Sequence, residues 1–186
     1  AKIYEPDVKV EDLIEGDVEA ILVFLRNTAF GSEFEMELLD PKTNEKFKTN
    51  IDLSVLKVKD FTLQEDANGE YAFYLPISKK NITFKYLTNK QEEDIENIRK
   101  GDGSVVPVNT KRLEMMIKSV EGNRDQMTIY QFIQNLPIKD SQEFRKYSNE
   151  NKPGIDLVVG VTTPSGDTVK TIIDFGVDFF RPFYGL

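Results

Sequence analysis

The chain contains neither cysteine nor histidine among its 186 residues. Disulfides, and zinc sites that use thiolate or imidazole ligands, are therefore excluded, so packing and hydrogen bonds must hold the fold. A hydrophobic fraction of 39% with 13 Phe supplies the material for a core. A folded chain of this length buries roughly 70% of the surface that its unfolded form exposes. We predict one composite domain or two small ones, without a structural metal.

The same absences restrict function. Without histidine or cysteine the chain lacks the usual general base and the thiol nucleophile. The net charge of −8 disfavours nucleic-acid binding, because phosphates would be repelled. No apolar run is long enough for a membrane span, and the start AKIYEPDVKV lacks the pattern of a secretory signal. We therefore predict a non-enzymatic protein with no cofactor.

Residues 1–15 are predicted to form an N-terminal arm, and residues 16–87 a helix followed by a β segment. Asp17 suits a helix N-cap and Gly31 a helix C-terminus, which predicts a helix over residues 17–27. The apolar stripe of this helix consists of Val18, Ile21, Leu22 and Leu25. Beyond it, alternating apolar and polar side chains predict strands over residues 34–38, 47–53, 55–63, 71–75 and 82–86.

Residues 88–152 are predicted to form a helical segment. Thr88 and Gln91 have the spacing of a capping box, which starts the first helix. The second helix is expected to place Leu113, Met116, Ile117 and Val120 on one face. A third, short helix contains Ile129, and Ser141 is expected to cap a fourth. Residues 153–186 return to strands at 155–161 and 169–175, so the order of elements predicts an α+β fold.

A short turn separates the strands predicted at 34–38 and 47–53, and another separates those at 155–161 and 169–175, so we predict two hairpins, and their sequences are similar. Residues 48–53 read K-T-N-I-D-L and residues 170–175 read K-T-I-I-D-F, each a few residues after a proline at the tip. This similarity predicts one small antiparallel β subdomain built from both hairpins, with the helical segment inserted between them. It would resemble a zinc ribbon without its metal, because the tips carry no thiolates. Chance similarity between two amphipathic hairpins is the alternative.

Arg26 is the one cation of the predicted first helix, and two structural roles are open to it. In one, it lies near the helix C-terminus and compensates the helix dipole. In the other, it forms a buried pair with Asp52 or Asp174, the acidic residue of the repeated hairpin pattern.

The last nine residues, 178–186, contain four aromatic side chains and one arginine. Aromatic residues and arginine dominate the energetics of protein interfaces. We therefore predict a docking element that consists of Phe180, Arg181, Pro182, Phe183, Tyr184 and Leu186. In the alternative interpretation, Phe179 and Phe180 complete the protein's own core.

Short sequence blocks along the chain carry a family resemblance. In chain order they are GDVEAIL at 16–22, LR at 25–26, AFG at 29–31, Phe34, IDLS at 51–54, LP at 75–76, LP at 136–137, DS at 140–141 and DFFRP at 178–182. Together they resemble the T4-like phage baseplate hub assembly family. Some members of that family carry cysteine pairs at the hairpin tips, and this chain departs from that pattern.

The resemblance implies a part of the contractile-tail baseplate, or a factor that helps to build its hub, and it implies no catalytic motif. The expected partners are other baseplate and tail proteins. The expected locations are the cytoplasm of the host bacterium during assembly and the baseplate of the virion. Two alternatives are a dissociable assembly chaperone that is absent from the mature particle and a hydrolase that uses only carboxylates.

Overall fold

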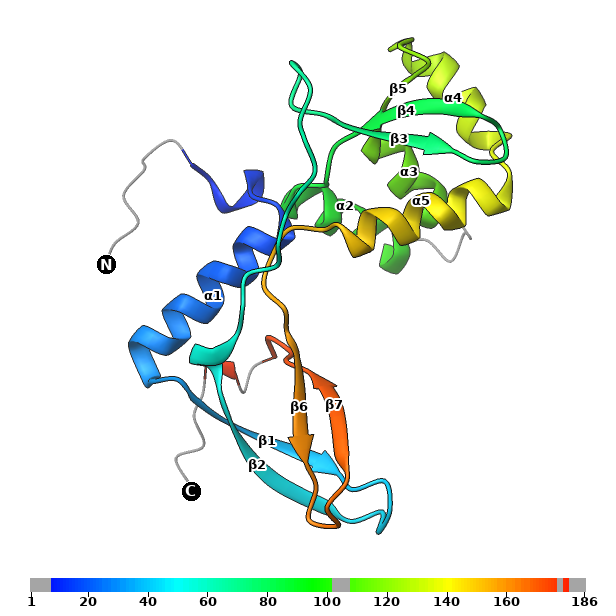
Figure 1. Ribbon diagram of the computed structural model, residues 1–186. Helices are drawn as coiled ribbons and strands as arrows, with labels where there is room; N and C mark the ends of the chain where they lie inside the picture. The colour runs from blue at the N-terminus through cyan, green and yellow to red at the C-terminus, as the bar shows by residue number, and fades with distance from the viewer. Residues whose placement is uncertain (1–7, 102–107, 177–178, 181–186) are drawn as a thin grey trace. The chain divides into compact units, whose positions relative to one another are not determined.

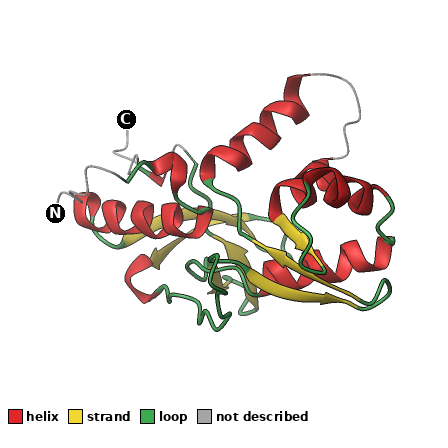
Figure 2. Ribbon diagram, turned by 90° about the horizontal axis from the view of Figure 1, so that it is seen from above, coloured by secondary structure: helices red, strands yellow, loops and turns green. Residues whose placement is uncertain are grey.

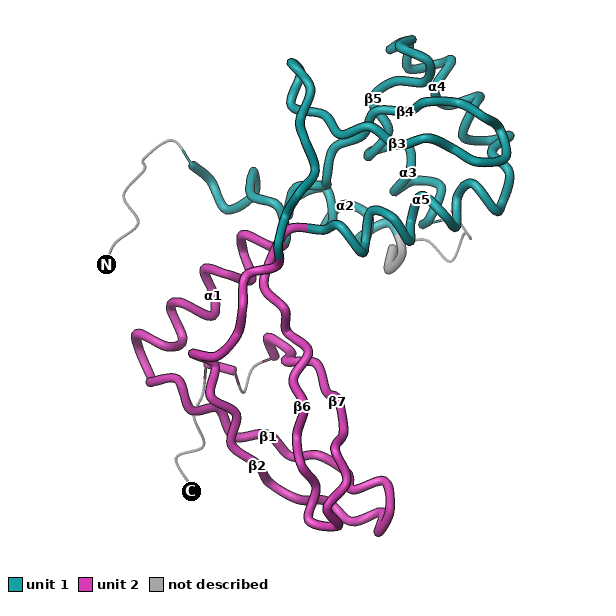
Figure 3. Tube along the Cα trace, viewed as in Figure 1, with its two compact units in different colours: residues 1–15, 60–152 teal, residues 16–59, 153–186 magenta. Residues whose placement is uncertain are grey.

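The computed structural model describes residues 8–101, 108–176 and 179–180. The chain divides into two compact units (Figure 3). Unit 1 comprises residues 1–15 and 60–152, and unit 2 comprises residues 16–59 and 153–186. The described residues form helices and small antiparallel sheets of two or three strands, which confirms the predicted α+β class (Figure 2). Within the described ranges, no helix has the length and apolarity required to cross a membrane.

Unit 1 is a three-stranded antiparallel sheet with helices (Figure 1). The strands are β3 (Tyr71–Leu75), β4 (Lys80–Phe84) and β5 (Ile117–Val120), in the order β3-β4-β5. The helices are α2 (Asn89–Gly101), α3 (Val108–Met116), α4 (Gln126–Gln134) and α5 (Ile138–Glu150), after a 3₁₀ turn, η1 (Val10–Asp12). Phe84 of the central strand and Phe144 of α5 are fully buried with their rings 5.0 Å apart, so the sheet and α5 share one core.

Local sequence signals set several element boundaries in unit 1. The amide of Thr88 donates to the Gln91 side chain at 3.0 Å, and the Gln91 amide donates back to the Thr88 hydroxyl at 3.4 Å. This is the predicted capping box at the start of α2. Asp125 caps α4 in a similar way, because its carboxylate accepts from the Thr128 amide at 2.8 Å.

Two helix predictions for this unit are wrong. Residues 117–120 form β5, which pairs with β4, and the helix before it ends at Met116. The strand ends in a tight turn at Glu121 and Gly122, both with positive φ, and that turn joins Val120 to Asn123 by two main-chain hydrogen bonds. The fourth helix starts at Ile138 after Pro137, so Ser141 lies within its first turn and does not cap it.

The described residues of unit 2 form one α-helix, α1 (Glu15–Phe30, whose first residue is assigned to unit 1), and two hairpins. The first hairpin pairs β1 (Glu33–Leu39) with β2 (Lys46–Asp52), and the second pairs β6 (Val158–Thr162) with β7 (Thr168–Ile172). Each hairpin is a two-stranded sheet of its own, and a short 3₁₀ helix, η2 (Leu53–Val55), follows β2. Their inner faces and α1 enclose one core, formed by Val23, Phe34, Ile51, Leu53, Ile155, Val161, Ile173 and Phe179.

The two segments of unit 2 are joined closely at their boundaries. Gly16 lies against the main chain of Pro153 and Gly154, so that a Cβ on Gly16 would come within 2.1 Å of the Pro153 carbonyl oxygen. Val58 and Ile155 form an isolated antiparallel bridge nearby. The close approach explains why a glycine occupies the first turn of α1, where another residue would favour the helix.

The predicted helix at 17–27 is present with longer bounds, and Gly31 ends it with a φ of 81°. The strand predicted over residues 55–63 is wrong. This segment contains the end of η2 and the single bridge at Val58, and both Val55 and Val58 are exposed. Strands β1 and β2 lie in unit 2, whereas β3 and β4 lie in unit 1.

Candidate functional site

The tips of the two hairpins in unit 2 are hydrogen-bonded to each other. Asp40, at the tip of the first hairpin, is only 1% exposed. Its carboxylate accepts from the amide of Lys42 at 2.9 Å within its own turn. It also accepts from the Ser165 amide at 3.1 Å and from the Ser165 hydroxyl at 2.9 Å, 125 residues later in the sequence. We call this contact the tip joint.

The second tip has a matching construction. Thr163 precedes a proline, as Asp40 does, and is also buried. Its amide donates to the carbonyl of Asp167 at 2.8 Å, and its hydroxyl lies 2.9 Å from that of Ser165. The tip joint therefore uses a carboxylate, two hydroxyls and main-chain amides, where a zinc ribbon would use four metal ligands.

The hydrogen bonds of the tip joint stabilise a charged carboxylate. Burial by itself would raise the pKa of Asp40, because it disfavours the charged form. The bonds from Lys42, Ser165 and Thr43 outweigh burial and lower the pKa below its ordinary value. Asp40 is therefore ionised at neutral pH and stabilises the joint in that form.

Unit 1 contains a second carboxylate of this kind. Asp140, in the first turn of α5, is fully buried and accepts from the amides of Ile77 and Ser78 at 2.8 Å each. Burial would raise its pKa, but these bonds and that from the Ser78 hydroxyl lower it. In both units a buried aspartate thus fixes a hairpin turn to a distant segment of the chain.

Arg26 lies near the C-terminal end of α1 and bonds to main-chain carbonyls beyond it, while its compensation of the helix dipole stays a prediction. It is only 2% exposed, and its guanidinium donates to the carbonyls of Gly31 at 2.6 Å and Glu33 at 2.9 Å, just beyond the end of α1. Asp52 and Asp174 are exposed, so neither forms the buried pair of the second interpretation. The Asp52 carboxylate instead accepts from the Ser54 amide at 2.9 Å and caps η2.

The predicted docking element falls largely outside the described residues, because Arg181, Pro182, Phe183, Tyr184 and Leu186 all follow Phe180. Phe179 is fully buried, and its ring lies 5.4 Å from that of Phe34 and 5.0 Å from that of Phe180. Phe180 is partly buried against the same core. Phe179 thus completes the core of unit 2, as the alternative interpretation expects.

Sequence reasoning missed the apolar side chains that unit 2 exposes. Phe24, Leu25 and Phe30 of α1 are each more than two-fifths exposed. The sequence did indicate this exposure, because the helix has apolar side chains on nearly every face and can bury only one face. On β6 and β7, Val158 and Ile172 are also exposed and face each other across the hairpin. These side chains are candidates for contact with another protein.

Among the described residues, no group of three or more acidic side chains is arranged to hold a metal ion. The sequence profile of one family, described as T4 bacteriophage base plate protein, matches residues 1–181. Neither the curated proteins nor the solved structures include a significant match.

Proposed function

Because the chain belongs to the T4 bacteriophage base plate protein family, we propose that it is a non-enzymatic structural or assembly protein of a contractile-tail baseplate. It acts in assembly of the hub, through contacts with other baseplate and tail proteins. The observation that carries this proposal is the length of the match, since residues 1–181 of 186 include parts of both units. The blocks that resemble hub assembly proteins also lie in both units, which supports the hub assignment.

We propose that unit 2 supplies the surface that contacts the other baseplate proteins. Its exposed apolar side chains on α1 and on the β6–β7 hairpin offer surface that is favourable to remove from water. The docking element adds Arg181, Phe183 and Tyr184, which are residue types that dominate interface energies. Phe179 anchors the chain in the core immediately before this element.

Deletion of residues 181–186 tests the docking element. We expect the truncated protein to keep a urea unfolding midpoint near that of the full chain, because the buried anchor Phe179 remains. We expect assembly to weaken, measured as the yield of infectious particles when the variant complements a phage that lacks the gene. Phe179→Ala is the matched control, and should cost about 3–5 kcal/mol of unfolding free energy because it empties a core position. Unfolding of the truncated protein at a much lower urea concentration would show that the tail belongs to the core.

Mass spectrometry of purified virions distinguishes a component from a chaperone. A structural protein should be present in the particles at a fixed ratio to the other baseplate proteins. Its absence from virions, together with failed baseplate assembly when the gene is removed, would assign the chain as a dissociable chaperone. During assembly we expect it in the host cytoplasm in either case.

A further inference from the structure

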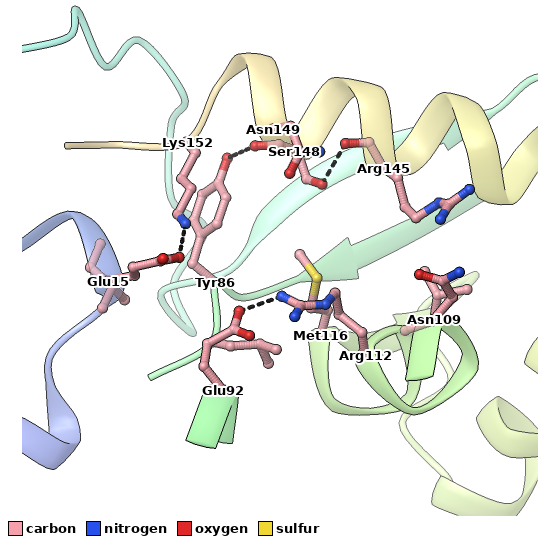
Figure 4. A pocket seen from close by; sticks show the side chains of 13 residues that line it. Glu15, Tyr86, Glu92, Asn109, Arg112, Met116, Arg145, Ser148, Asn149 and Lys152 are labelled. Carbon is pink, nitrogen blue, oxygen red and sulfur yellow. Dashed lines mark hydrogen bonds and ion pairs between the residues drawn. The ribbon is translucent and has the colours of Figure 1, made fainter. Parts of the chain in front are cut away.

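Unit 1 contains a pocket of about 230 Å³ that is lined mainly by polar and charged side chains (Figure 4). It lies among α2, α3, α5 and the segment that follows β4. Ile14, Leu87, Leu113 and Met116 form its apolar part. The polar and charged residues of its lining are Glu15, Tyr86, Glu92, Asn109, Arg112, Arg145, Ser148, Asn149 and Lys152.

Most of the charges in the pocket are already paired. Lys152 bonds to Glu15, and Arg112 bonds to Glu92, as the dashed lines in Figure 4 show. The lining holds three cations against two carboxylates, which leaves one positive charge in a chain whose net charge is −8. That remaining charge is Arg145, from the middle of α5.

Arg145 has an unsatisfied buried donor. Its Nε is buried and has no hydrogen-bond partner within the described part of the chain. A buried N–H without a partner costs free energy, so native structures nearly always satisfy it. Arg124 in the same unit shows the contrast, because its guanidinium bonds to both oxygens of Glu70 at 2.8 and 2.9 Å. The unpaired guanidinium in a polar pocket therefore indicates a ligand that accepts hydrogen bonds.

We propose that this pocket binds a single carboxylate group, supplied by an acidic side chain of a partner protein. A carboxylate matches the fork of a guanidinium, which can donate two parallel hydrogen bonds to it. The amides of Asn109 and Asn149 line the same pocket and can donate further bonds. One net positive charge neutralises a monoanion, whereas a phosphate dianion would remain uncompensated beside Glu15 and Glu92. The identity of the carboxylate as a partner's rests on the proposed role in baseplate assembly.

The test uses the full chain and the Nε–Hε signals of its arginines in ¹⁵N NMR spectra. The probe is N-acetylglutamate α-amide, which carries one carboxylate, and N-acetylglutamine α-amide is its neutral control. We expect the Arg145 signal to move with saturation at about 10 mM probe, which is typical for one small ligand with few contacts. The Arg124 signal should stay in place, because that guanidinium is already bonded to Glu70. The glutamine compound should leave both signals unchanged.

Arg145→Met tests the role of the side chain while preserving most of its apolar length. Followed through the Asn109 side-chain amide signal, probe binding should weaken at least tenfold in this variant, with an unchanged thermal midpoint. Three results would overturn the proposal: no saturating shift up to about 50 mM probe, equal shifts with the neutral compound, or binding of inorganic phosphate but not of the carboxylate. All three concern the isolated chain, so they would leave the role in the baseplate standing.

Discussion

The two hairpins of unit 2 share a sequence pattern but differ in the face that they turn to solvent. On the inside, Ile51 of β2 and Ile173 just beyond β7 occupy the same place in the pattern and are both buried. On the outside, the β1–β2 hairpin carries two ion pairs, Glu35 with Lys48 at 2.8 Å and Glu37 with Lys46 at 2.6 Å. The β6–β7 hairpin instead carries Val158 opposite Ile172, both exposed.

This difference shows that the fold restricts the inner face of each hairpin and not its outer face. Alternate residues of a strand face opposite sides, so the inner half of the pattern is determined by the shared core. The outer half is free to vary between the hairpins. Because β6–β7 exposes apolar side chains where β1–β2 exposes ion pairs, the second hairpin is the one whose outer face is better suited to contact with another protein.

The largest expected effect comes from the inner face. Ile51→Ala and Ile173→Ala should each lower the free energy of unfolding by about 2–5 kcal/mol, because each removes buried methyl groups and leaves a cavity. The matched control is Ile172→Ala, since the neighbouring side chain is 65% exposed while that of Ile173 is 1% exposed. The control should change the free energy by less than about 0.5 kcal/mol. Urea unfolding followed by circular dichroism measures all three.

A large loss of unfolding free energy for Ile51→Ala but not for Ile173→Ala would contradict the interpretation that the two positions are equivalent. It would mean that the second hairpin packs on a core that the first hairpin forms without it. Similar losses for the two inner positions would establish that the shared pattern marks one core.

Strong local patterns made parts of this fold predictable. The hairpin at β1–β2 follows from strict alternation, and the start of α2 follows from the spacing of Thr88 and Gln91. The pattern shared by residues 48–53 and 170–175 predicted that both hairpins lie in one subdomain, and in the structure they share the core of unit 2. Local periodicity succeeded where local and tertiary preferences agree.

The predictions were wrong or missing where contacts between residues far apart in the sequence determine the local structure. Leu113, Met116, Ile117 and Val120 fit a helical face, but β4 provides a pairing edge that converts residues 117–120 into a strand. The β-branched side chains of Ile117 and Val120 and the following Glu121-Gly122 turn were the local signals for that strand. The tip joint could not be foreseen, because nothing near Asp40 in the sequence indicates that Ser165 would donate to it.

Substitutions at the tip joint should have an intermediate effect on the free energy of unfolding. Ser165→Ala should cost about 1 kcal/mol of unfolding free energy, because it removes the hydroxyl that donates to Asp40. Asp40→Asn should destabilise more, because it replaces the charge that several donors surround. EDTA should leave the wild-type midpoint unchanged, since the joint consists of hydrogen bonds alone.

The effect of Asp40→Asn should depend on pH. The pKa of Asp40 is lower in the folded chain than the value of about 3.9 in an unfolded one, so its contribution is complete above about pH 4. That contribution is lost as pH falls through the folded pKa. The difference in urea midpoint between wild type and Asp40→Asn should therefore be constant from pH 7 to 5 and should shrink toward pH 3. A difference that stays the same at pH 3 would show that the charge of Asp40 does not stabilise the joint.

The smallest effect should come from the outer face of β1–β2. The hydrogen bond between Glu37 and Lys46 is the main cause that raises the pKa of Lys46 and lowers the pKa of Glu37, so both are charged throughout the neutral range. Both side chains are exposed, and exposed ion pairs contribute little because water and salt screen them. Lys46→Gln should leave the urea midpoint within experimental error, as should the matched change Lys170→Gln on the outer face of β7. A clear loss for Lys46→Gln alone, reduced at high salt, would mean that the ion pairs help to hold the first hairpin. The contrast between the two outer faces would then be one of stability as well as of exposed surface.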